Sequence, residues 1–393
     1  MIQSRPVNAA TARARGGVGW RIAVTSVWLI GACDGDPTFG DGQIDVRWTI
    51  SEGSGIAAPP YVDAELTLFA PLVSPGLVAA STATGTLLWH ADIDISAAGR
   101  SRLPLSRPAR VGNLVVVPAW DLVALDAADG SVRWRYAPNF DFPGVTSPAV
   151  AGSRIVSSGN YLHVVDATTG QVVWWQNLEE RPFEPVVDDG VIYFGARGPI
   201  PGSGEYPEAP LGAGHVWAID LETGGVLWKT FLPADPSDPA RGGVSGLGAL
   251  TEDLFIVAGA DLRIHALSRA TGDVVWSTPT PGPTFRAGVV VVDGVAVTAG
   301  LQGGASGYDV VTGEPLWTFP VSSSITSPLV LQGSNVVMTV GRLFAIEAVT
   351  GRQVWADGGA AWGGPIYLSA AAVAPDGTVI AGDEKAVYAL DTR

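Results

Sequence analysis

The chain repeats the stretch Val164-Val165-Asp166-Ala167-Thr168-Thr169-Gly170-Gln171-Val172-Val173-Trp174, in which a hydrophobic strand leads to Asp, then to Gly, then to Trp at four-residue intervals. Seven copies of this spacing occur. The first turn position is Asp126, Asp166, Asp220 or Asp309 in four copies, and Ser81, Ser268 or Glu347 in the other three. The turn glycines are Gly85, Gly130, Gly170, Gly224, Gly272, Gly313 and Gly351. Repetition at this period indicates one repeat architecture.

Each repeated residue has a physical role. An Asp side chain at a turn can accept hydrogen bonds from backbone N–H groups two or three residues further on, and Ser does the same more weakly. Glycine tolerates the positive φ of a tight turn. The tryptophan offers a large apolar surface to a neighbouring sheet, with an indole N–H that needs a partner.

The two ends of the chain supply an eighth unit. Residues 387–393 repeat the hydrophobic strand and its Asp, and residues 44–48 repeat the Trp strand without a turn. The eight repeat tryptophans are Trp48, Trp89, Trp134, Trp174, Trp228, Trp276, Trp317 and Trp355, spaced 38 to 54 residues apart. Each unit holds four short β-rich runs. We therefore predict an all-β fold: an eight-bladed β-propeller of four-stranded antiparallel sheets, its ring closed by the N- and C-terminal strands.

The first 33 residues read as an export signal. Residues 1–21 contain four arginines and no acid, and the uncharged run 22–32 follows them. This run is too short for a membrane-spanning helix, which needs about 20 residues. The run ends Leu29-Ile30-Gly31-Ala32-Cys33, which resembles the lipobox of bacterial lipoproteins, where the Cys carries the lipid. We expect a lipoprotein signal over residues 1–33, a tether over 34–43 and the propeller over 44–393. The alternative is an ordinary signal peptide with an incidental Cys33.

Composition excludes several classes of protein. The net charge of −15 lacks the basic footprint of a nucleic-acid binder. A single Cys excludes an intramolecular disulfide. A hydrophobic share of 47% argues against a disordered chain.

The repeat resembles that of the pyrroloquinoline-quinone-type propellers, whose consensus is roughly S-P-V-V…D-G-x-V-Y-V-G…L-Y-A-L-D-A-x-T-G-x-x-x-W. The third and seventh units match it from Ser147-Pro148 and Ser327-Pro328 onward, and the resemblance covers about residues 44–393. It implies the same eight-bladed fold. Because the motif packs blades together, it does not by itself select a function.

The resemblance implies one of two functions. Quinoprotein alcohol dehydrogenases of this kind bind the quinone and a calcium ion in the central channel, and many have a disulfide between adjacent cysteines that this chain cannot form. BamB-like lipoproteins of the outer-membrane β-barrel assembly machinery are non-catalytic, and their length, lipobox and blade count are similar to those of this chain.

We therefore expect a non-catalytic scaffold for protein–protein interaction, with envelope protein partners and no nucleic acid, cofactor or metal. A lipid on Cys33 would hold it to a bacterial membrane, inner or outer, on the periplasmic or cell-surface face. The alternative is a dehydrogenase-like propeller that binds pyrroloquinoline quinone with calcium, or another ligand, in its channel.

Candidate functional residues follow from repeat position. The starts of the innermost strands should line the channel, and the residues there include Ser147, Glu184, Arg286, Ser327 and Trp362. The insertions 197–214 and 233–246 are either binding loops or tolerated surface insertions. His163 and His265 occupy a slot that holds an aromatic ring in other units, so we expect them to be structural.

We predict that Cys33→Ser abolishes metabolic labelling with a radioactive fatty acid, because the thiol is the site of lipid attachment. Labelling of the variant at the wild-type level would exclude a lipoprotein.

Overall fold

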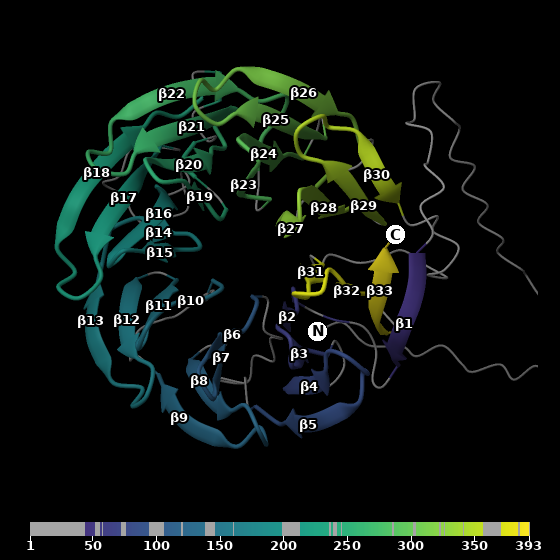
Figure 1. Ribbon diagram of the computed structural model, residues 1–393. Helices are drawn as coiled ribbons and strands as arrows, with labels where there is room; N and C mark the ends of the chain where they lie inside the picture. Colours follow the sequence, from purple (N-terminus) through teal and green to yellow (C-terminus); the bar gives the residue numbers. More distant parts are fainter. Residues whose placement is uncertain are drawn as a thin grey trace, which may run out of the picture. The chain divides into compact units, whose positions relative to one another are not determined.

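The structure, a computed structural model, describes residues 44–392 apart from residues 52–55, 57, 72–75, 94–105, 119–120, 138–145, 160, 199–212, 236, 239–241, 245, 285–286, 302–303, 322–323, 326, 341, 357–370 and 384–385. The expected signal and tether, residues 1–33 and 34–43, lie outside the described residues. The described strands form eight antiparallel sheets arranged in a ring around a centre (Figure 1). This confirms the predicted eight-bladed propeller.

Strands of the same rank occupy the same radial position in every blade (Figure 1). The innermost strands are β2 (Tyr61–Val62), β6 (Ala109–Val111), β10 (Ala149–Ala151), β14 (Arg181–Pro182) with β15 (Val186–Asp188), β19 (Ala249–Leu250), β23 (Val289–Val292), β27 (Val330–Gln332) and β31 (Ala372–Val373). The second strands are β3 (Leu66–Phe69), β7 (Leu114–Pro118), β11 (Arg154–Ser158), β16 (Val191–Arg197), β20 (Leu254–Ala258), β24 (Val295–Ala299), β28 (Asn335–Thr339) and β32 (Val379–Gly382).

The outer half of each blade carries the repeat motif. The third strands, which lead into the turn, are β4 (Leu77–Ser81), β8 (Leu122–Asp126), β12 (Leu162–Asp166), β17 (Gly214–Asp220), β21 (Arg263–Ser268), β25 (Ala305–Asp309), β29 (Leu343–Glu347) and β33 (Val387–Thr392). The outermost strands, which hold the tryptophans, are β5 (Leu87–Ala91), β9 (Val132–Tyr136), β13 (Val172–Gln176), β18 (Val226–Leu232), β22 (Val274–Pro279), β26 (Pro315–Phe319), β30 (Gln353–Ala356) and β1 (Ile44–Ile50). We number the blades 1 to 8 from β2–β5 to β31–β33 with β1.

Blade 8 is assembled from both ends of the described chain. Strand β1 pairs antiparallel with β33, from Ile44 opposite Thr392 to Ile50 opposite Val387. Arg47 on β1 forms ion pairs with Asp376 and Asp391, both at 2.7 Å. The bond from Arg47, with help from Thr378, lowers the pKa of Asp376 to about 2. This confirms the predicted closure of the ring.

Blade 4 departs from the four-stranded pattern. Its innermost position is divided between β14 and β15, which both pair with β16, so the sheet has five strands. Proline has no N–H to donate to a ladder. Pro182 and Pro185 flank the interruption, and this accounts for the divided strand.

One contact joins successive blades. In blade 3, the Asp166 Oδ1 accepts the N–H groups of Thr168 and Thr169 at 3.1 and 2.9 Å, and Gly170 has a φ of 71°. The indole of Trp134, from blade 2, lies on Gly170, where a Cβ would be 2.6 Å from the ring. The same indole donates its N–H to the Ala167 carbonyl at 2.8 Å.

The contact recurs at six further blade junctions. The pairs of Trp and Gly are Trp48–Gly85, Trp89–Gly130, Trp174–Gly224, Trp228–Gly272, Trp276–Gly313 and Trp317–Gly351. In each, the indole N–H also donates to the backbone carbonyl of the residue after the first turn position, at 2.8 to 3.1 Å.

The eighth tryptophan uses a different partner, because no turn connects β33 to β1. Trp355 donates its N–H to Gln332 Oε1 at 3.1 Å. The amide of Gln332 in turn donates to the Gly377 carbonyl and Thr392 Oγ1, at 2.7 and 2.8 Å. A cavity of about 230 Å³ lies beside these groups. A side chain therefore replaces the turn carbonyl at the point where the ring closes.

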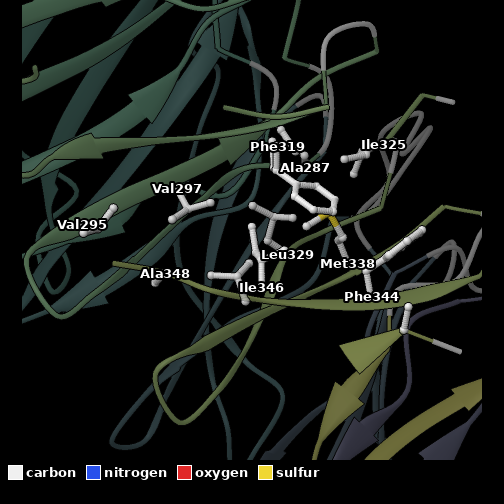
Figure 2. Close-up of a cluster of buried hydrophobic side chains, with 14 residues drawn as sticks. Ala287, Val295, Val297, Phe319, Ile325, Leu329, Met338, Phe344, Ile346 and Ala348 are labelled. Carbon is white, nitrogen blue, oxygen red and sulfur yellow. The ribbon is translucent and has the colours of Figure 1, made fainter. Parts of the chain in front are cut away.

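The hydrophobic core is divided among the blade junctions. The buried apolar residues form eight clusters, and each cluster draws its members from two neighbouring blades. Figure 2 shows the cluster between blades 6 and 7, where Val297 of β24 and Phe319 of β26 share a layer with Met338 of β28 and Ile346 of β29. Burying this layer between sheets stabilises the ring at every junction.

We predict that Gly170→Ala is more destabilising than Gly152→Ala by about 1–3 kcal/mol, the usual cost of overpacking a well-packed site. Both glycines have positive φ, at 71° and 56°, but a Cβ on Gly152 meets nothing within 4 Å. Gly152→Ala therefore measures the backbone strain alone. Equal losses in chemical denaturation would show that the indole does not need a glycine beneath it.

Candidate functional site in the central channel

The innermost strands surround the centre of the ring (Figure 1). Residues on or beside five of them line a cavity. Its volume is about 420 Å³, and its walls come from blades 1, 2, 3, 7 and 8. The lining residues are Pro60, Tyr61, Val62, Arg107, Pro108, Ala109, Arg110, Pro148, Val150, Val330, Leu331, Ala372 and Val373. Prolines and aliphatic residues line it together with Tyr61, Arg107 and Arg110, and polar atoms make up the larger part of its surface. Its volume lies in the range of small-molecule sites.

Two of the expected channel residues lie together at one end of the innermost strands. The Ser147 hydroxyl donates to Glu184 Oε1 at 2.8 Å, and Ser147 Oγ accepts the backbone N–H of Arg107 at 3.2 Å. These three residues stand before the innermost strands of blades 3, 4 and 2. The hydrogen bonds therefore connect three successive blades around the channel.

Ser327, another expected channel residue, lies apart from this group. Ser327 is buried and donates to the Thr339 carbonyl at 3.3 Å, inside its own blade. Arg286 and Trp362 lie outside the described residues.

Arg107 was missed in the sequence, although a signal was present. It precedes Pro108 as Ser147 precedes Pro148, Glu184 precedes Pro185 and Ser327 precedes Pro328. In these four blades, the position before this proline is thus a slot at the start of the innermost strands. Reading that slot through every unit would have identified Arg107.

Arg110, the other arginine of the cavity wall, is neutralised. It pairs with Asp63 at 2.7 Å and Glu65 at 3.0 Å, both from blade 1. Burial raises the pKa of Asp63, but the Leu66 N–H and the Arg110 guanidinium outweigh it and hold the pKa below its usual value. Arg110 therefore bridges blades 1 and 2.

A second polar cluster lies at the foot of the insertion 197–214, whose residues 199–212 are outside the described residues. The buried carboxylate of Glu180 pairs with His215 Nδ1, accepts the Trp217 N–H at 3.3 Å and lies 3.7 Å from Lys229 Nζ. Lys229 Nζ also stands 4.0 Å from the centre of the Trp217 ring. A buried carboxylate surrounded by donors is satisfied electrostatically, so this cluster ties Glu180 to β17 and β18 of blade 4.

The insertion 233–246, of which only part is described, meets the first insertion at its base. The Val244 N–H donates to the Ala196 carbonyl at 3.3 Å, and Gly243 lies against Gly214. A Cβ on Gly195 would stand 2.2 Å from the Val244 side chain. The two insertions thus begin side by side over blades 4 and 5.

The two histidines of the ring slot are buried and have polar partners. His163 Nδ1 lies 2.9 Å from the Tyr136 hydroxyl, and His265 Nε2 lies 2.9 Å from Asp261 Oδ2. Burial lowers the pKa of His163 to about 4. His163 is therefore neutral at pH 7 and packs as an aromatic ring.

A calcium ion takes about six to eight oxygen ligands. Among the described residues, no three His, Cys, Asp or Glu side chains are close enough together to hold a metal ion. The absence of a cofactor stays a prediction. None of the described residues belongs to a helix that is long and apolar enough to cross a membrane.

Eight blades, docked at seven of their eight junctions by Trp-on-Gly contacts, define a pyrroloquinoline-quinone-type β-propeller. The family model described as outer membrane protein assembly factor BamB matches residues 7–141, 121–356 and 263–393. The chain belongs to this family.

Individual relatives carry different names. Tetrathionate hydrolase of Acidithiobacillus ferrooxidans is 23% identical over 87% of this chain and 65% of its own length. Outer membrane protein assembly factor BamB of Burkholderia pseudomallei is 26% identical over 61% of this chain and 60% of its own length. The chain thus spans less than two thirds of either relative. Quinoprotein alcohol dehydrogenases match shorter parts of it.

A solved structure shows the same fold. The crystal structure of BamB from Moraxella catarrhalis superposes with a TM-score of 0.68 at 14% identity, covering 89% of this chain and all of that one. At this identity the likeness shows the fold alone.

We predict that the free energy of unfolding falls by about 3 kcal/mol between pH 7 and pH 4 through His163, since each pKa unit corresponds to about 1.4 kcal/mol. Its pKa is about 4 in the folded protein and 6.5 when unperturbed, so the unfolded chain binds the extra proton in this window. His163→Phe, a ring found in the equivalent slot at Phe344, should remove this part of the pH dependence in denaturation curves. His90→Gln, at an exposed position, should leave this pH dependence unchanged. If His163→Phe showed the same pH dependence as the wild type, His163 would not be its source.

Proposed function

We propose that this protein is a non-catalytic, envelope-anchored propeller that binds protein partners during outer-membrane protein assembly. The observation that carries the proposal is the match of the BamB family model along almost the whole chain. Relatives that are named outer membrane protein assembly factors support it. The lipid on Cys33 would hold the propeller at the membrane.

The paired insertions are the surface we assign to the partner. Loops on a rigid scaffold carry binding residues more often than the elements they connect. The described residues at the bases of the two insertions lie side by side, since Gly243 lies against Gly214 and a Cβ on Gly195 would meet Val244. A partner would therefore meet two long loops on a fixed base.

We predict that deleting residues 199–212 abolishes recovery of the partner after cross-linking in cells, without lowering the melting temperature. The deletion leaves the sheet intact, because the Gly198 N–H already donates to the Ala213 carbonyl at 2.8 Å across the gap. The matched control is Glu252→Ala in the turn between β19 and β20, at the opposite ends of the strands. Recovery of the same partner from the deletion variant would remove the loop from the interface.

The alternative is a ligand-binding, dehydrogenase-like propeller. The channel cavity of about 420 Å³ and the alignments with tetrathionate hydrolase and the quinoprotein dehydrogenases favour it. Saturable quenching of tryptophan fluorescence by pyrroloquinoline quinone with calcium, together with dye-linked alcohol oxidation, separates it from the scaffold.

A further inference from the structure

Most arginines with a described ion pair or hydrogen bond are neutralised, and Arg47, Arg110 and Arg154 each contact two carboxylates. Arg107 is exposed at the wall of the channel cavity. Among the described residues, its guanidinium has neither a hydrogen bond nor an ion pair. The chain has 38 acidic and 23 basic side chains, so an unpaired arginine is not explained by a shortage of carboxylates.

The backbone of Arg107 is held in place at the cavity wall. Its N–H donates to Ser147 Oγ at 3.2 Å, and the following Pro108 also lines the cavity. Because proline fixes its own φ and restricts the residue before it, the main chain at Arg107 has little freedom. Arg107 thus carries an exposed positive charge on a restricted backbone.

The neighbouring carboxylates already have partners. Asp63 and Glu65 accept from Arg110, and Glu184 accepts from Ser147. The Tyr61 hydroxyl donates to Asp63 at 3.3 Å. The positive charge of Arg107 is therefore the free polar group at this part of the wall, where Pro60, Pro148 and Leu331 supply apolar surface.

We propose that the channel cavity binds a small oxoanion with an apolar or polarizable body, held by a bidentate contact to the Arg107 guanidinium. A planar guanidinium matches the two oxygens of a carboxylate or a sulfonate-like group, and it holds them more strongly than a neutral donor does. The prolines and aliphatic side chains among the lining residues receive the body of the ligand. The volume of about 420 Å³ suits a small molecule.

Isothermal titration of the full chain tests the proposal with three probes at constant ionic strength: benzoate, tetrathionate and sulfate. We expect saturable 1:1 binding of benzoate or tetrathionate, and weaker binding of sulfate, which has no extended body. Arg107→Gln should weaken the binding by about tenfold or more, the effect of losing a charged hydrogen-bond pair. Benzoate binding without tetrathionate binding would identify a carboxylate as the ligand group, and the reverse would identify a sulfur oxoanion.

Two further variants separate the site from general electrostatics. Arg107→Lys keeps the charge but loses the planar guanidinium that makes the bidentate contact. It should therefore bind the anion more weakly than the wild type and more tightly than Arg107→Gln. Arg352→Gln removes a charge from a side chain that is 77% exposed, and it should bind like the wild type. Arg107→Gln should keep the wild-type melting temperature, because the side chain has no hydrogen bond to lose.

No saturable binding of any probe at millimolar concentration, or equal binding by Arg107→Gln, would overturn the proposal. The proposed role in outer-membrane assembly is tested independently of anion binding. Arg107→Gln should still recover the partner after cross-linking, and the protein that lacks residues 199–212 should still bind the anion.

Discussion

The propeller depends on the contact of a tryptophan ring with a glycine in the next blade. The indole lies so close to the turn that a single Cβ on Gly170 would reach 2.6 Å from it, and the indole N–H satisfies a turn carbonyl at 2.8 Å. The turn keeps the required backbone because Asp166 accepts two of its N–H groups. Sequence, turn and packing thus agree at one point, and the agreement is repeated around the ring.

The junction between blades 7 and 8 shows which part of this contact is indispensable. No Asp–Gly turn is present there, yet the indole N–H of Trp355 still has an acceptor, the side chain of Gln332. Gln332, in blade 7, also bonds across the junction to Gly377 and Thr392 of blade 8. A buried indole without an acceptor would leave a polar group unsatisfied, at a cost of about 1–3 kcal/mol. The glycine can be replaced, whereas the acceptor is retained.

The architecture could be predicted from the sequence because its determinants are local. Asp, Gly and Trp lie within nine residues of one another, so eight repetitions reveal the blades and their closure. Pro182 and Pro185 indicate the divided strand in blade 4 as well. A prediction of four strands for every unit does not take these two prolines into account. The site is different, because its contacts join distant residues: Glu180 meets His215 35 positions later, and Ser147 meets Glu184 37 positions later.

Sequence position placed five residues near the channel but could not rank them. Ser147 and Glu184 belong to one hydrogen-bonded group, whereas Ser327 points into its own blade. The distinguishing property of Arg107 is the lack of a side-chain partner, and no motif encodes that. It emerges only when the pairing of every neighbouring carboxylate is known.

The closing strand also determines how the molecule would respond to mechanical force. If a lipid on Cys33 holds the chain, tension enters the propeller at Ile44, the first residue of β1, which is paired with Thr392. A pull directed away from the sheet at this end opens the antiparallel pair one step at a time instead of shearing all its bonds together. The first interactions that oppose the separation of the strands are the ion pairs of Arg47 with two carboxylates. The packing of Trp48 on Gly85 follows. The ring would therefore yield at blade 8 while the other seven sheets remain unloaded.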